Sequence, residues 1–199
     1  MMIEKESTGD TKGKILDVAQ DLIQRFGLNA MSFQHLSDAV GIKKSSVHHH
    51  FPSKDLMVNA LLERYIDDFG VIVKEILSSR TSGKTKLKRY CGLFVGTLEN
   101  SEHEKSCLCG MLAAEMFSLN DDGLDLVQSF MSGNVESIRE MIRIGVEDGS
   151  LGSKSAAAGT ADLVLATLEG GLLIARCDGG PKQLADVIKR LLVFLSSDA

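Results

Sequence analysis

The chain has 199 residues, of which 44% are hydrophobic, 25% are charged and 5% are aromatic, and its formal net charge is −5. A chain of this length forms one domain or a small module joined to a larger one, and it buries enough surface to fold without disulfides or metal. Its uncharged runs are shorter than the roughly 20 apolar residues that span a bilayer, and the segment MMIEKESTGDTKGK lacks the apolar stretch of a signal peptide. We therefore expect a cytoplasmic protein and neither a membrane protein nor a secreted one.

Apolar residues that recur at three- and four-residue spacing predict an all-α protein of about nine helices. Gly27 and Gly41 follow two of the periodic runs and are predicted to end those helices, and Ser32 and Ser53 stand where N-cap residues stand. Pro52 ends the third helix, because the residue before a proline disfavours helical geometry. In chain order, the predicted helices cover about 11–26, 33–40, 44–50, 54–79, 85–99, 107–118, 123–148, 156–177 and 182–196.

The first three predicted helices have the arrangement of a helix-turn-helix. A short helix ends at Gly41, which can adopt the left-handed conformation that a tight turn needs, and a second short helix follows at once. This second helix, Lys44–His50, has a polar outer face that suits the major groove of DNA. The segment 43–54 holds three lysines and no acid, which is a local basic patch on an otherwise acidic chain.

The segment MSFQHLSDAVGIKKSSVHHHFPSKDLMVNALL resembles the N-terminal DNA-binding domain of the TetR family of bacterial repressors, over about residues 11–62. The resemblance implies a helix-turn-helix DNA-binding domain in residues 1–55 and an effector-sensing and dimerisation domain in residues 56–199. The family usually has tyrosine where His48 and often His50 stand. An imidazole would then donate the phosphate hydrogen bond that the phenol usually makes.

Several residues of this segment are predicted to contact operator DNA. Ser32 and the lysines also have plainer interpretations, as a helix cap and as solvated charge. Lys54 lies at the start of the fourth helix, where exposed amides attract phosphate, and is predicted to pair with one. The histidine run is not expected to bind metal, because consecutive helical residues point about 100° apart. The predicted DNA-binding residues are Ser32, Gln34, Lys43, Lys44, Ser45, Ser46, His48, His49 and Lys54.

The four cysteines are expected to be reduced thiols and not a disulfide framework. Ser106 is predicted to cap the helix at 107–118, which would put Cys107 in the first turn, next to Lys105. There the helix dipole and the ammonium group would favour a thiolate, with a pKa below the free value of about 8.5.

The stretch CLCGMLAAEMF resembles a branch of the family that controls reductases and detoxifying enzymes, typified by the N-ethylmaleimide reductase repressor. The resemblance implies that Cys107 senses electrophiles or oxidants. In that branch a lysine on a later helix can cooperate with the cysteine, and Arg176 stands at its place here. The alternatives are sensing by Cys109, a soft-metal site that adds His103 to the two thiols, and a buried, inert cysteine.

The last two predicted helices carry apolar stripes that suit either the core of one chain or the two-fold dimer interface that the resemblance implies. The residues of these stripes are Leu163, Ala166, Leu168 and Leu172 on the first helix and Leu184, Val187, Ile188, Leu191, Leu192 and Leu195 on the second. Methionines elsewhere in this domain can line an adaptable ligand cavity or belong to an ordinary core: Met111, Met116, Met131 and Met141.

The sequence shows no Ser/His/Asp set, metal motif or glycine-rich phosphate loop, so we expect neither an enzyme nor a bound cofactor. The predicted function is a DNA-binding transcriptional regulator, a repressor, that binds an inverted-repeat operator as a homodimer. A small-molecule or thiol-reactive effector releases it. The alternative is a helix-turn-helix protein whose C-terminal domain mediates protein contacts without a small ligand. A large apolar pocket would favour the first reading, and a solid core the second.

Overall fold

The computed structural model describes residues 8–196, and within this range the chain forms nine α-helices, two short 3-10 helices and no strand. This confirms the predicted all-α class. The elements are α1 (Thr8–Phe26), α2 (Phe33–Val40), α3 (Lys44–His50), α4 (Lys54–Ser78), α5 (Gly83–Glu99), α6 (Leu108–Ala114), η1 (Met116–Ser118), α7 (Asp121–Glu147), η2 (Ser153–Ala156), α8 (Thr160–Cys177) and α9 (Gly180–Ser196).

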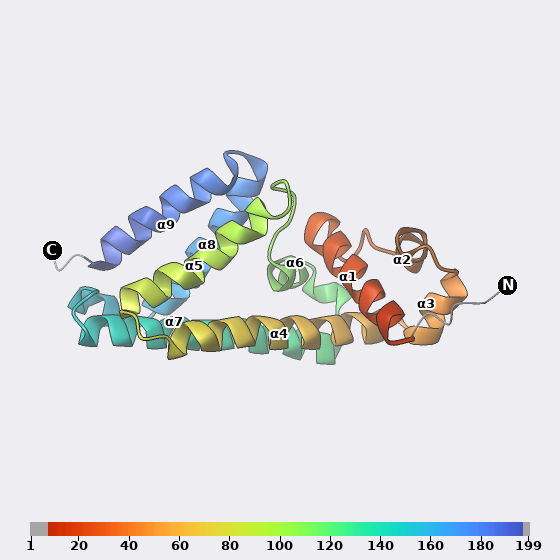
Figure 1. Ribbon diagram of the computed structural model, residues 1–199, viewed down its shortest axis with the longest axis horizontal. Coiled ribbons are helices and arrows are strands. Elements are labelled where there is room, and N and C mark those ends of the chain that lie inside the picture. The colour runs from red at the N-terminus through yellow and green to blue at the C-terminus, as the bar shows by residue number, and fades with distance from the viewer. Residues whose placement is uncertain (1–7, 197–199) are drawn as a thin grey trace.

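The first three helices form a small head at one end of an elongated molecule (Figure 1). Their inward faces meet in an apolar centre that includes Ile15, Ile23, Leu36 and Val47, none of which is exposed to solvent. Phe51, directly after α3, is also buried. Burial of these side chains stabilises helices that are too short to form alone.

Helix α4 leaves the head and runs along the long axis of the molecule beside α7 (Figure 1). Helices α5 and α8 pack on this pair, and α9 packs on α5 and α8 to complete the larger domain. The predicted boundary at residue 55 therefore falls at the start of α4, and one continuous helix connects the two domains. Motion of the larger domain can reach the head directly along this helix.

The predicted and observed helices differ most at two places. The predicted helix at 107–118 is divided into α6 and the 3-10 helix η1, and α8 starts at Thr160 instead of about residue 156. Ahead of α8, residues Ser153–Ala156 form their own 3-10 turn, and Gly159 has a left-handed φ of 82°. In the described part of the chain, no helix is both long and apolar enough to cross a membrane.

Candidate nucleic-acid interface and sensor core

The turn between α2 and α3 is closed by hydrogen bonds that sequence analysis anticipates. The hydroxyl of Ser32 accepts a hydrogen bond from the backbone N–H of His35 at 3.2 Å, which confirms its N-cap role. Gly41 has a φ of 75°, and the N–H groups of Gly41 and Ile42 both donate to the carbonyl of Ser37 at 3.0 Å. Only glycine adopts this left-handed conformation without strain. The turn therefore fixes the angle at which α3 leaves α2.

Helix α3 faces inward through one residue and outward through most of the others. Val47 is fully buried, whereas Ser46 and His50 are half-buried. The His48 ring packs edge-on against Phe33 with 4.9 Å between centroids, which restricts how the imidazole turns. Five of the predicted DNA-binding residues form a continuous exposed face at this end of the head: Lys43, Lys44, Ser45, His48 and His49.

Two further residues predicted to contact DNA have partners within the head. The Gln34 amide donates to the Asp38 carboxylate at 2.8 Å along the exposed side of α2. The Lys54 ammonium donates to the backbone carbonyls of Leu28 at 2.6 Å and Met31 at 2.8 Å. The Lys54 ammonium therefore clamps the loop between α1 and α2, and its contact with phosphate stays a prediction. Burial also lowers the pKa of Lys54 from its ordinary value, against the opposing effect of nearby Glu115.

Sequence reasoning did not single out Lys12. This residue is exposed on α1, and its ammonium lies 5.5 Å from the centre of the Phe51 ring, a cation–π arrangement. The contact joins α1 to the end of α3 and adds a positive charge to the head. Its only signal in the sequence is a lysine near the start of the first helix.

The head is fastened to the larger domain at the C-terminal end of α1. The side-chain amide of Gln24 donates to the backbone carbonyl of Ser106 at 2.8 Å, and the N–H of Ser106 donates back to the carbonyl of Gln24 at 3.1 Å. The carboxylate of Glu115 accepts hydrogen bonds from the N–H of Leu28 and from the side chain of Asn29, the latter at 3.1 Å. Both ends of α6 thus hold the segment that leads from α1 to α2.

Charged side chains reinforce this junction. Lys105 pairs with Asp21 at 2.8 Å, and Arg25 pairs with Asp21 and with Glu104. The guanidinium of Arg176 donates to the backbone carbonyl of Arg25. Sequence analysis groups Arg176 with the thiol sensor, but the structure places its guanidinium against α1, where it joins α8 to the head.

The structure differs from the predicted environment of Cys107 in its helix cap, its burial and the pKa of its thiol. Cys107, and not Ser106, is the N-cap of α6, and its sulfur accepts a hydrogen bond from the N–H of Gly110 at 3.4 Å. The side chain is buried, and Lys105 is engaged by Asp21. Burial raises the pKa of the Cys107 thiol well above its usual range, and the Glu169 carboxylate raises it further. The thiol is therefore protonated at neutral pH, because desolvation outweighs the helix dipole.

Cys107 belongs to a polar cluster in the centre of the larger domain. Oε2 of Glu169, on α8, and Cβ of Cys107 both lie against the backbone of Gly110. Burial and the nearby Cys107 thiol raise the pKa of Tyr65, on α4. Burial raises the pKa of Glu169 above its ordinary value. Cys109 is fully buried nearby, and burial raises the pKa of its thiol as well. Neither Tyr65 nor Glu169 carries a motif that sequence analysis recognises.

The four cysteines are all free thiols. Cys91, Cys107 and Cys109 are buried, whereas Cys177 is exposed at the end of α8. Within residues 8–196, no group of three or more His, Cys, Asp or Glu side chains is arranged to hold a metal ion. The soft-metal alternative for Cys107, Cys109 and His103 therefore finds no geometric support in the described range.

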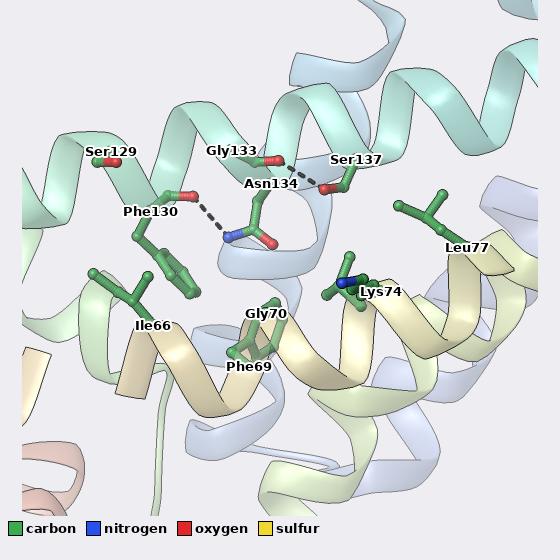
Figure 2. A pocket seen from close by; sticks show the side chains of 11 residues that line it. Ile66, Phe69, Gly70, Lys74, Leu77, Ser129, Phe130, Gly133, Asn134 and Ser137 are labelled. Atoms are coloured by element: carbon green, nitrogen blue, oxygen red, sulfur yellow. Dashed lines mark hydrogen bonds between the residues drawn. The ribbon is translucent and has the colours of Figure 1, made fainter. Parts of the chain in front are cut away.

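A groove of about 320 Å³ follows the seam between α4 and α7 (Figure 2). Its α4 side is lined by Ile66, Phe69 and Leu77, with Lys74 beside them. On the α7 side Asn134 is buried and holds its amide between the Tyr90 hydroxyl, which donates to it at 2.6 Å, and the Phe130 carbonyl, which accepts from it at 2.7 Å. None of the four methionines proposed for a ligand cavity lines this groove: Met111, Met116, Met131 and Met141.

An apolar face on α8 and α9 remains exposed. Most of the predicted stripe is core within one chain: Leu168, Leu172, Leu184, Ile188, Leu191, Leu192 and Leu195 are buried. The exposed apolar residues lie on the opposite sides of these helices: Leu163, Leu173, Ile174, Val193 and Phe194. Phe194 is 69% exposed, which is unusual for a phenylalanine in a domain this large. Exposed apolar patches of this kind mark interaction sites.

Comparison with known proteins matches both parts of the chain. Residues 15–61 match the family described as "Bacterial regulatory proteins, tetR family". Residues 83–191 match the "Tetracyclin repressor-like, C-terminal domain". These ranges correspond to the head with the start of α4, and to the larger domain.

Two curated relatives are transcriptional repressors. The HTH-type transcriptional repressor KstR2 of Mycobacterium tuberculosis is 33% identical over 92 residues, which cover 46% of this chain and 44% of the repressor. The match therefore spans less than half of that relative's length. The HTH-type transcriptional repressor NemR of Escherichia coli is 22% identical over 148 residues, covering 74% of this chain and 72% of NemR.

Solved structures share the whole fold. A TetR-family transcriptional regulator from Agrobacterium tumefaciens superimposes with a TM-score of 0.90 at 26% identity, covering 96% of this chain and all of that one. The reduced form of E. coli NemR superimposes with a TM-score of 0.78 at 21% identity, covering 92% of this chain and 95% of that one.

Proposed function

The chain belongs to the TetR family of bacterial regulatory proteins, a family of DNA-binding transcriptional regulators, and we propose that it represses transcription by binding an inverted-repeat operator as a homodimer. The exposed face of α3 carries this proposal. Lys43 and Lys44 stand at its start, Ser45 and His48 follow, and no acidic side chain lies between residues 43 and 54. Short donors and cations on a helix of this size suit base edges and phosphates in the major groove.

The exposed apolar face of α8 and α9 supports the homodimer. It lies on α8 and α9 of the larger domain, where a second copy can pack against it about a two-fold axis. Ala166 and Gly170 are small residues on the same helix, and they allow the facing helix to approach closely. Such a dimer presents its two α3 helices about 34–36 Å apart, one turn of DNA.

Selection of bound sequences from a random duplex library tests the operator proposal. We expect an inverted repeat whose half-sites lie about one helical turn apart. Lys44→Ala, on the exposed start of α3, is expected to relax the preference at one position of each half-site, whereas Lys154→Ala on the larger domain leaves the preference unchanged. A single half-site, or no sequence preference, would refute the proposal.

We infer that an electrophile releases the repressor by adding to Cys107. This thiol caps α6, and the far end of the same helix leads to Glu115, which binds the loop between α1 and α2. An adduct adds volume inside a close-packed domain, where small changes are transmitted as displacement of packed elements. A shift of α6 would therefore move the head and change the separation of the two reading helices.

The α4–α7 groove supports a second route, in which a noncovalent ligand causes release. Its volume lies at the small end of the range of ligand sites. Its α4 side is apolar apart from Lys74, and its α7 side adds the polar side chains of Ser129, Asn134 and Ser137. The variant Cys107→Ser distinguishes the two routes. Release that persists in Cys107→Ser favours the groove, and release that disappears favours the thiol.

A further inference from the structure

The cluster around Cys107 holds a carboxyl group with one oxygen that has no hydrogen-bond partner. Glu169 projects from α8 into the larger domain, and its Oε1 atom is buried without a hydrogen-bond partner. Burying an unsatisfied polar atom costs free energy, so such a group in a native core calls for an explanation. Its other carboxyl oxygen lies against α6, next to Cys107.

Gly110 makes room for this arrangement. A side chain there would place its Cβ 2.5 Å from Oε2 of Glu169 and 3.4 Å from Cβ of Cys107. The carboxyl and the thiol therefore pack together over one backbone position that has no side chain of its own. Gly110 also donates its N–H to the Cys107 sulfur, which fixes the thiol on the same side of the helix.

The geometry points to a specific role for the carboxylate: we propose that Glu169 accepts the Cys107 thiol proton when Cys107 adds to an activated alkene such as a maleimide or a quinone. This inference rests on the proposed covalent release at Cys107. It resolves a difficulty in that proposal, because a buried thiol is protonated and a thiol attacks far more slowly than a thiolate. A carboxylate beside the thiol can accept its proton as the new bond forms, so that no free thiolate is needed beforehand.

The proposed step is balanced without an oxidant. The sulfur of Cys107 forms a bond to the β-carbon of the alkene while its proton passes to Glu169. The electron pair of the C=C bond moves toward the carbonyl, and the resulting enolate takes up a proton at the α-carbon, which returns Glu169 to the carboxylate. The product is a thioether, and the net change is addition of the S–H group across the double bond.

Two features of the cluster favour this step. Tyr65 lies near Cys107, and its hydroxyl can donate to the sulfur as negative charge develops there. Burial raises the pKa of Glu169 above its ordinary value and makes it a stronger base than an exposed carboxylate. Arg176, in contrast, is engaged with the carbonyl of Arg25.

The test measures N-ethylmaleimide adducts by mass spectrometry, resolved for each cysteine, on the full chain. Glu169→Gln keeps the size of the side chain and removes the base. We expect it to slow adduct formation at Cys107 about 100-fold, the lower end of general-base effects. Glu169→Asp is expected to recover part of the rate. Cys177, exposed on α8, is the internal control and reacts alike in all three proteins.

The sign of the change separates this proposal from a purely electrostatic role. If Glu169 only repels the thiolate, replacing it with glutamine makes Cys107 react faster, and the proposal is overturned. A wild-type Cys107 that gains no adduct after Cys177 is fully modified overturns it too. Gly110→Ala supplies a second variant, because its methyl group displaces the carboxyl and is expected to slow Cys107 alone.

The outcome is also separable from the proposed function. An adduct that forms with Glu169 dependence but leaves DNA binding unchanged contradicts covalent release and retains the proton-transfer role. Release that follows an adduct whose rate does not depend on Glu169 contradicts the proton-transfer role and retains covalent release.

Discussion

Glu115 and Lys54 bind the same residue of the α1–α2 loop, one at its N–H group and the other at its carbonyl. The Glu115 carboxylate accepts a hydrogen bond from the N–H of Leu28, and the Lys54 ammonium donates to the carbonyl of Leu28. Glu115 directly follows α6 in the larger domain, whereas Lys54 begins the helix that connects the two domains. The loop therefore takes its position from both elements, and a displacement of α6 pulls directly on the head.

Replacing Lys54 with methionine tests the clamp. We expect Lys54→Met to lower the free energy of unfolding by about 1–2 kcal/mol, because two carbonyls lose a charged donor at a half-exposed site. The slope of operator affinity against salt should stay unchanged. In Lys43→Ala, which loses an exposed charge at the N-cap of α3, that slope should fall by about one unit. A reduced slope in the Lys54 variant would instead assign it a phosphate contact.

Glu115→Gln is expected to weaken the coupling between the sensor core and the head. The amide retains the size of the side chain but loses the negative charge. That charge strengthens the hydrogen bonds that Glu115 accepts from the Leu28 N–H and the Asn29 side chain. Operator affinity should change less on N-ethylmaleimide treatment than in the wild type. Glu136→Gln on α7, whose carboxylate pairs only with a nearby arginine in the described contacts, is the matched control. Equal responses in both variants would exclude Glu115 from the coupling.

Phe194→Glu is expected to convert the dimer to a monomer in sedimentation experiments and to weaken operator binding. A charge placed on the exposed apolar face of α8 and α9 would be buried in the dimer without a partner. Phe117→Glu is the control, because Phe117 is 96% exposed on η1 and lies outside that face. If the Phe194 variant remains a dimer, the two copies associate through another surface.

Glu169 makes stability depend on pH. Its pKa in the folded protein is raised by burial, so the folded state binds a proton more tightly than the unfolded state does. This contribution to stability is present in full below the ordinary carboxyl pKa and is lost as the pH rises through the folded value. Glu169→Gln should therefore gain stability relative to the wild type as the pH rises above the ordinary carboxyl pKa, measured by urea unfolding. If the difference in stability between the two proteins does not change with pH, the carboxyl is not buried in solution.

The N-terminal part of the fold could be predicted because its signals are local. Ser32, Gly41 and Ser53 act within four residues of their own positions, and the structure shows each as the cap or turn that the sequence indicates. Apolar spacing likewise predicts the helices, because a helix must bury one face.

The candidate sites depend on contacts between distant segments, and these were less predictable. The partner of Lys54 is a backbone carbonyl 26 residues away, and no local pattern marks it. The lowered pKa expected of the Cys107 thiol is not found, because a helix start favours thiolate only where water or a cation remains, and here the thiol is buried beside Glu169. That carboxyl follows Cys107 by 62 positions in the printed sequence, so only the tertiary fold brings the two together.

An operator-binding titration with and without N-ethylmaleimide, on wild type and Cys107→Ser, tests the central claim that modification of the sensor core releases the head. The account predicts that treated wild type loses operator affinity by about tenfold or more, a typical size for coupling between two sites. It predicts that treated Cys107→Ser, which keeps Cys177 and the other thiols, binds as tightly as the untreated protein. Equal release in both proteins, or release in neither, would contradict the account.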